Sequence, residues 1–166
     1  MLAAACSAAF AQDFSLESVG ARAGFSPTAN SRDFHQAEAY LNLNLPWRWN
    51  LGKQWTLQSR LDSSAGWLGN PYRDAAVLTL GPSLLLQRED FPLSFEAGSS
   101  PTLLSDDDFV TKDFGDLFQF TSHVGFNLDL TRRVRLGYRF QHMSNGGISG
   151  NNPGLNLHFF KISYLF

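Results

Sequence analysis

The sequence has no run of 18 consecutive apolar residues, which excludes a transmembrane helix. It contains one cysteine, Cys6, and this excludes a disulfide framework. Charged residues make up 17% of the 166 residues, below the soluble average of about 25%. The net charge of -2, without a basic cluster, excludes an electrostatic nucleic-acid surface. Aromatic residues, in contrast, are abundant: they make up 14% of the chain, and 15 residues are phenylalanine.

The first eleven residues, MLAAACSAAFA, form an apolar run rich in alanine. Ala9, Phe10 and Ala11 fit the small-x-small pattern of a signal-peptidase site. We therefore expect residues 1–11 to be the remnant of a signal peptide and residues 12–166 to be one exported domain. A short buried helix is the alternative, and a lipoprotein anchor through Cys6 is disfavoured because Ala3 stands where a lipobox prefers leucine.

Alternation of apolar and polar residues recurs along the chain, whereas no segment sustains a helical period of 3.6. In residues 116–130, for example, the even positions are mainly apolar, while the odd positions carry polar side chains such as Gln119 and Asp129. Eight segments follow this pattern: residues 14–25, 35–46, 54–67, 75–88, 93–103, 116–130, 133–145 and 154–166. The pattern predicts eight strands, each with one apolar and one polar face.

The connections between these segments alternate in character. Short turns are predicted at PWRWNLGK, REDFP and LTRRV, and longer polar loops at SPTANSRD, LGNPYRD, SDDDFVTKD and NGGISGNNPG. This asymmetry, together with the terminal Phe166, is typical of bacterial outer-membrane barrels. We predict an all-β protein, an eight-stranded antiparallel transmembrane β-barrel whose polar face fills a narrow lumen. A soluble lipocalin-type barrel is the alternative, because it has the same periodicity with the apolar face inside.

The residues His142 and Ser144 interrupt an apolar face near the end of the seventh segment. They share their parity with Val134, Leu136 and Phe140, so the pattern places both on the surface that faces lipid. Side chains at i and i+2 lie about 6.5–7 Å apart on a strand, and an imidazole can therefore lean toward a hydroxyl. This pair is the minimal unit for nucleophilic acyl transfer. The alternative is that both residues simply meet lipid headgroups.

Neighbouring residues complete the candidate site. Asn156 shares the apolar parity of the eighth segment and can orient the imidazole ring from the adjacent strand. An oxyanion hole is predicted from three backbone N–H groups that follow the serine, those of Asn145, Gly146 and Gly147.

Residues 138–166, YRFQHMSNGGISGNNPGLNLHFFKISYLF, resemble the lipid A 3-O-deacylase (PagL) family of outer-membrane acyl hydrolases. The resemblance rests on His142, Ser144 and Asn145 with two following glycines, and on a turn formed by Asn152 and Gly154. It implies metal-free hydrolysis of the ester-linked acyl chain at position 3 of lipid A, at a lipid-facing site in the outer leaflet.

The resemblance also assigns roles to individual residues. Ser144 would be the nucleophile and His142 the general base, with Asn152 contacting the substrate. Asn156 stands where the type member of the family has a glutamate. An amide can orient histidine, but it cannot stabilise an imidazolium by charge, so weaker activity is expected.

A non-enzymatic outer-membrane barrel with a structural, adhesive or lipid-binding role is the alternative function. No metal or other cofactor is predicted, because His35, His123 and His158 lack ligand spacing. The expected partners are lipopolysaccharide and the bacterial outer membrane itself. The sequence leaves open whether the barrel forms a homodimer.

Overall fold

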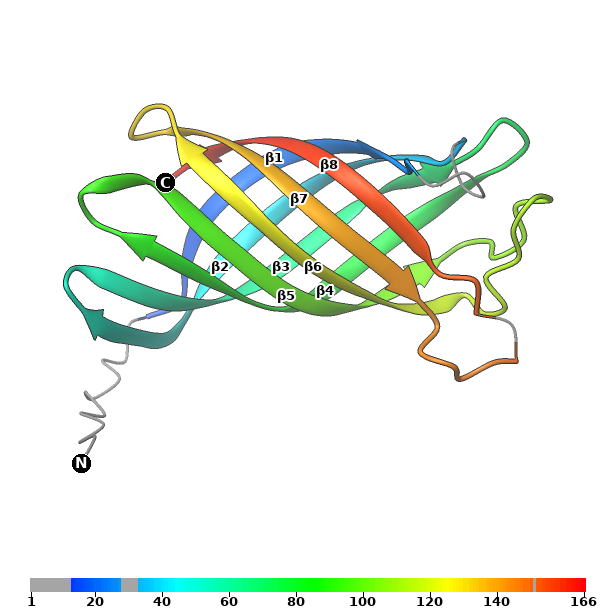
Figure 1. Cartoon of the computed structure of the whole chain (residues 1–166), viewed down its shortest axis with the longest axis horizontal. Helices are drawn as coiled ribbons and strands as arrows, with labels where there is room; N and C mark the ends of the chain where they lie inside the picture. Colours follow the sequence, from blue (N-terminus) through cyan, green and yellow to red (C-terminus); the bar gives the residue numbers. More distant parts are fainter. Residues whose placement is uncertain (1–12, 28–32, 151) are drawn as a thin grey trace.

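The computed structural model describes residues 13–27, 33–150 and 152–166, which form a closed barrel of eight antiparallel strands (Figure 1). The strands follow sequence order around the barrel, and β8 pairs with β1 to close it. Their bounds are β1 Ser15–Phe25, β2 His35–Gly52, β3 Trp55–Gly69, β4 Asp74–Arg88, β5 Phe91–Leu104, β6 Phe118–Asp129, β7 Val134–Ser144 and β8 Leu155–Leu165. The predicted fold class is confirmed. The expected signal-peptide remnant, residues 1–11, lies outside the described residues.

The prediction of a turn at PWRWNLGK, residues 46–53, is wrong. β2 continues to Gly52, and the chain reverses at Lys53 and Gln54, whose φ angles are 49° and 67°. Positive φ at both central residues is the geometry of a tight two-residue hairpin. The pairing of β2 with β3 shifts between Asn44 and Arg48, around Pro46. A bulge accommodates proline because the interrupted ladder does not require its missing N–H.

The opposite end of the barrel, here called the loop end, carries the segments 26–34, 70–73, 105–117 and 145–154. The segment 70–73 is shorter than predicted, because β3 extends to Gly69 and β4 begins at Asp74. Asn70 closes this turn by accepting hydrogen bonds from the backbone N–H groups of Tyr72 and Arg73, at 3.0 and 2.9 Å. The other three segments remain long, so the predicted asymmetry between the two ends holds for most connections.

Charged side chains fill the interior of the barrel. The buried Glu96 carboxylate accepts hydrogen bonds from Arg60 at 3.2 Å, Arg139 at 2.9 Å and Lys161 at 2.6 Å. The outer wall instead exposes large apolar side chains, among them Leu78, Val124, Phe160 and Ile162. A soluble barrel would have the reverse arrangement, because such a wall is unfavourable in water. The lipocalin-type alternative is therefore wrong, and the wall suits the hydrocarbon of a membrane.

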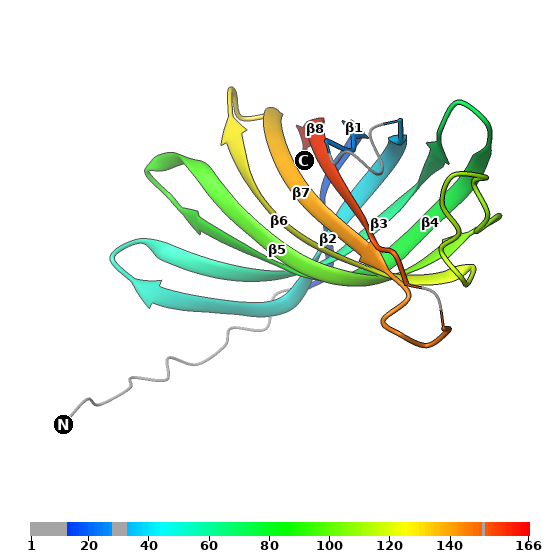
Figure 2. The same ribbon diagram turned by 45° about the vertical axis from the view of Figure 1, so that its right-hand side comes forward.

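A buried aromatic cluster, here called the plug, lies at the loop end of the barrel. It consists of Phe34, Phe109 and Phe114, all at most 2% exposed, with ring centroids 5.1–5.8 Å apart. Two of these rings come from the segment 105–117, which lies at the same end as the segment 145–154 (Figure 2). The plug thus gives the loops of this end a common apolar support.

Candidate active site

The register of β7 places His142 and Ser144 on the outside of the barrel. Arg139, Gln141 and Met143 point into the lumen and are buried. The side chains between them point outward, so His142 is exposed and Ser144, the last residue of the strand, is half-buried. Both therefore lie on the outer surface at the loop end.

His142 pairs with Asn156 directly across β7 and β8. The Nδ1 atom of the imidazole lies 2.7 Å from the Oδ1 atom of Asn156. An amide oxygen can only accept a hydrogen bond, so Nδ1 must carry the proton in this contact. The other ring nitrogen, Nε2, then keeps its lone pair. This is the tautomer that a general base next to a serine requires.

Ser144 forms no hydrogen bond with His142 in the described part of the chain. Its cross-strand neighbour on β6 is Phe120, which contributes no polar group. Such hydrogen bonds are often loose or absent before substrate binds, and a rotation about χ1 of either residue changes their separation. The spacing of the two residues on one strand face thus keeps the hydroxyl within reach of the imidazole.

The side chain of Asn145 holds the loop that follows Ser144. Its amide donates to the carbonyl oxygen of Phe114 at 3.1 Å and to the hydroxyl of Ser149 at 2.7 Å. Its amide oxygen accepts the N–H of Gly147 at 2.8 Å. Asn145 is completely buried. The side chain therefore links the loop to the plug and is not directed at a substrate.

The three backbone N–H groups considered for an oxyanion hole differ in their hydrogen bonding. That of Asn145 donates to the side-chain oxygen of Asn152 at 3.1 Å, and that of Gly147 is used by Asn145 itself. The N–H of Gly146 has no hydrogen bond among the described residues. Gly146 and Gly147 have φ angles of 66° and 80°, which glycine adopts without a steric cost. In this conformation Gly146 is the open donor.

Gly154 leaves the space that the imidazole ring of His142 occupies. A Cβ atom built at Gly154 would lie 3.0 Å from the Cε1 atom of His142 and 3.6 Å from its Nε2 atom. The φ angle of 56° also favours glycine. The edge of the ring that carries Cε1 and Nε2 therefore lies beside Gly154.

Two contacts of the site were not predicted from the sequence. The carbonyl of Phe114 anchors Asn145 from a different loop, and the ring of Phe120 lies 3.2 Å from a Cβ position at Gly146. The local sequence indicates neither contact, because both depend on how segments that are distant in the sequence meet at the loop end. In the described residues, no group of three or more histidine, cysteine or acidic side chains is arranged to hold a metal ion.

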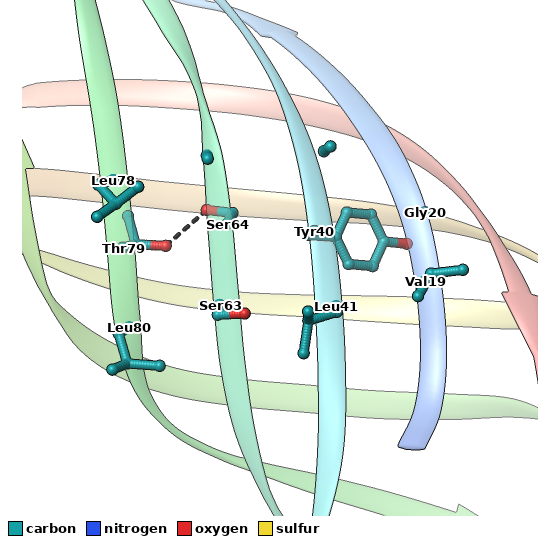
Figure 3. Close-up of a pocket in the computed structure, with 11 residues that line it drawn as sticks. Val19, Gly20, Tyr40, Leu41, Ser63, Ser64, Leu78, Thr79 and Leu80 are labelled. Atoms are coloured by element: carbon teal, nitrogen blue, oxygen red, sulfur yellow. Dashed lines mark hydrogen bonds between the residues drawn. The ribbon is translucent and has the colours of Figure 1, made fainter.

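A separate groove crosses the outer wall over β1–β4 (Figure 3). Val19, Leu41 and Leu80 lie along it, and the outward side chains of Ala39 and Ser63 are small enough to leave it hollow. No histidine or carboxylate lines the groove, so it offers no base for a nucleophile. The arrangement on β7 and β8 is therefore the better candidate for chemistry.

Comparison with known proteins identifies the relatives of this barrel. The model of the family described as lipid A 3-O-deacylase (PagL) matches residues 35–165, which include all the strands except β1. The chain belongs to this family. The match covers every residue of the candidate site, including His142, Ser144 and Asn156.

Individual relatives agree with this assignment. The lipid A deacylase PagL of Bordetella bronchiseptica is 41% identical over 71 residues, which span 43% of this chain and 40% of that protein. The crystal structure of the outer membrane enzyme PagL matches with a TM-score of 0.77 at 17% identity, covering 90% of this chain and 99% of the other. Neisserial surface protein A matches with a TM-score of 0.55 at 12% identity, covering 93% and 100%. These two likenesses show a shared fold. Together with the family, they confirm the predicted outer-membrane location.

Proposed function

We propose that this member of the PagL family hydrolyses the ester-linked acyl chain at position 3 of lipid A. The observation that carries the proposal is the outward-facing pair formed by His142 and Asn156, 2.7 Å apart, with Ser144 two residues further along the same strand face. The fold alone does not argue for activity, because one architecture hosts many functions. The proposal rests on the chemistry that these side chains make available on an otherwise apolar wall.

In the first half of the reaction, the Oγ atom of Ser144 attacks the carbonyl carbon of the ester. The Nε2 atom of His142 takes the hydroxyl proton as the bond forms. Collapse of the tetrahedral intermediate breaks the bond to the sugar oxygen, which receives this proton from His142. The deacylated sugar leaves with a free hydroxyl, and the acyl chain stays on Ser144 as an ester.

The second half of the reaction regenerates the enzyme. His142 removes a proton from a water molecule, which attacks the acyl-serine carbonyl. Collapse of this intermediate returns the proton to the Oγ atom of Ser144 and releases a free fatty acid. Asn156 holds the imidazole by its Nδ1 atom throughout, so the same Nε2 atom serves as base and then as acid.

Negative charge develops on the carbonyl oxygen in both steps. We assign its stabilisation to the backbone N–H groups of Asn145, Gly146 and Gly147, with Gly146 as the donor that is open in this conformation. Asn152 lies beside them and is assigned to substrate binding. Its side-chain oxygen accepts the N–H of Asn145, and we assign its amide nitrogen to a polar group of the substrate.

The place of the site on the wall fits a substrate that stays in the membrane. Polar side chains on a lipid-facing surface are costly unless they meet a partner there. A site near the loop end, which faces the exterior in a bacterial outer-membrane barrel, meets the outer leaflet where lipid A resides. The ester can thus reach Ser144 by lateral movement, without leaving the bilayer.

Mass spectrometry of lipid A after incubation with refolded protein tests the proposal. Wild-type protein is expected to remove one acyl chain from position 3. Ser144→Ala and His142→Ala are expected to lower the rate by at least about a thousandfold, as in other hydrolases that lose the nucleophile or base.

Ser63→Ala serves as the matched control, because Ser63 is also an outward-facing serine, on β3 within the groove of Figure 3. Its activity should equal that of wild type. Unchanged lipid A after incubation with folded wild-type barrel, or equal activity of Ser144→Ala and wild type, would overturn the proposal.

A further inference from the structure

The outer wall carries a row of polar side chains that extends beyond the proposed catalytic residues. Asn156 on β8 pairs with His142 on β7, His142 pairs with Ser122 on β6, and Ser122 pairs with Ser99 on β5. The hydroxyls of Ser122 and Ser99 lie 3.1 Å apart and hydrogen-bond each other. Both serines are exposed on the outside. These residues belong to the four neighbouring strands β5–β8 (Figure 1), and their cross-strand pairing makes one continuous polar row.

The wall on both sides of this row is largely apolar. On the side toward the turns, the matching positions on β5, β6 and β7 are Ala97, Val124 and Phe140. On the side toward the loops, Pro101 pairs with Phe120. A hydroxyl in this belt suits lipid less well than alanine or valine would, and the mutual hydrogen bond of Ser122 and Ser99 uses only one of their two hydroxyl protons. The paired serines therefore need a polar partner that lipid tails do not supply.

The row descends into the apolar belt as it leaves the catalytic residues. Asn156 is one residue from the end of its strand and His142 two residues, whereas Ser122 is four and Ser99 five residues from the loop end of their strands. An acyl chain whose carbonyl lies at Ser144 must also run from the loop end toward the membrane interior. The two serines thus lie beside the path of the first carbons of that chain.

We propose that Ser122, supported by Ser99, binds a polar group carried by the acyl chain that is removed, namely a hydroxyl or ester oxygen close to its carbonyl. This inference rests on the proposed function. It assigns to Ser122 and Ser99 the selection of the acyl chain that the protein removes. Ser122 is the diagonal neighbour of Ser144, and diagonal neighbours lie about 7–8 Å apart. An attack distance of about 3 Å and a hydrogen bond of about 2.8 Å leave roughly 2 Å. Since both serine hydroxyls can rotate about their Cα–Cβ bonds, one or two carbon–carbon bonds and a carbon–oxygen bond span that gap, so the polar atom belongs on the second or third carbon.

Ser122 is not positioned as a second nucleophile. The Nε2 edge of His142 points toward Gly154 on the β8 side, whereas Ser122 approaches the histidine from β6. The Nε2 edge therefore lies on the β8 side of the ring, away from Ser122, and the hydroxyl of Ser122 remains available to the substrate and to Ser99.

Two synthetic glucosamine lipids test the inference. They carry at the sugar O3 atom either a 3-hydroxytetradecanoyl or a plain tetradecanoyl chain, and kcat/KM is measured for both in the same detergent micelles. Wild-type protein is expected to favour the hydroxylated ester by a factor of about three to ten, the size of one net hydrogen bond. Ser122→Ala should bring this ratio close to one, Ser99→Ala should lower it less, and Ser122→Thr should retain it.

The controls separate this inference from the proposed function. Ser63→Ala removes an outward serine far from the row and should keep the wild-type ratio. A ratio in Ser122→Ala equal to that of folded wild type overturns the assignment of Ser122 while leaving the hydrolase intact. Hydrolysis of neither ester by folded wild type instead overturns the proposed function, and the inference with it.

Discussion

Replacing Asn156 by aspartate tests the contact that holds the imidazole ring of His142. Aspartate has the same shape as asparagine, so its carboxylate would lie where the amide now accepts from Nδ1 of His142 at 2.7 Å. The geometry is kept and a negative charge is added. During attack by Ser144 the imidazole becomes an imidazolium, so the added charge stabilises the transition state more than the neutral ground state.

The size of this effect follows from the surroundings of the pair. Two unit charges about 4 Å apart attract by about 1 kcal/mol in water and about 4 kcal/mol at an effective dielectric constant of 20. His142 is exposed and Asn156 half-buried, so an intermediate value of about 1.5–3 kcal/mol applies. Asn156→Asp should therefore raise kcat/KM by about ten- to a hundredfold. Asn156→Leu, which removes the hydrogen bond, should lower it by about five- to thirtyfold.

The assay is the release of fatty acid from a lipid A substrate, at a pH well above that at which histidine ordinarily binds a proton. Each variant is compared at equal amounts of folded barrel, and Ser144→Ala gives the background rate. The reasoning is refuted if Asn156→Asp and Asn156→Leu have the same activity. Equal activity would mean that the 2.7 Å contact neither orients the imidazole nor stabilises its charged form.

Three further outcomes follow from the structure. Gly154→Ala should lower kcat at least about tenfold in a folded barrel, because the new Cβ atom would lie 3.0 Å from the ring of His142 and displace it. The loss of kcat is measured in the lipid A assay. Glu96→Gln should cost about 3–5 kcal/mol in urea unfolding, because it removes the buried carboxylate that pairs with Lys161, Arg139 and Arg60, and unchanged stability would contradict the lumen network. Phe114→Ala should cost about 3–5 kcal/mol and also reduce activity, since loss of the ring from the plug loosens the backbone whose carbonyl anchors Asn145; full activity would show that the plug does not support the loop.

Periodicity predicted the eight strands because a barrel wall alternates strictly between two environments. The failure at PWRWNLGK has a local cause: Pro46 and two tryptophans resemble a turn, yet the strand absorbs the proline in a bulge. Periodicity alone could not choose between a lipid-facing and a lumen-facing apolar side, since both give the same period, and the prediction of a membrane barrel depended on the unequal loops and on Phe166. That choice was decided by the buried Glu96 and its cationic partners, which require a polar interior.

The candidate residues of the site were predicted unevenly. His142, Ser144 and Asn156 could be placed on one surface because parity within a strand follows directly from the sequence. The register between strands does not, so the contact of Ser122 with this row was not predicted. The hydrogen bond from Asn145 to Phe114 joins loops 31 residues apart, and no pattern in either loop signals it.

On β7, the side chains of the polar row and those of the lumen network lie on opposite faces of the same strand. This arrangement connects the stability of the barrel with the proposed chemistry. Arg139 and Gln141 point inward on β7, and His142 and Ser144 point outward between and beyond them. A slip of β7 by one residue would turn the arginine into lipid and the histidine into the lumen. The ion pairs of Arg139 with Glu96, at 2.9 Å, and with Asp62, at 3.1 Å, oppose that slip because an unpaired arginine in hydrocarbon is costly. The interior charges thus fix the register that places Ser144 and His142, the proposed nucleophile and base, on the outer wall.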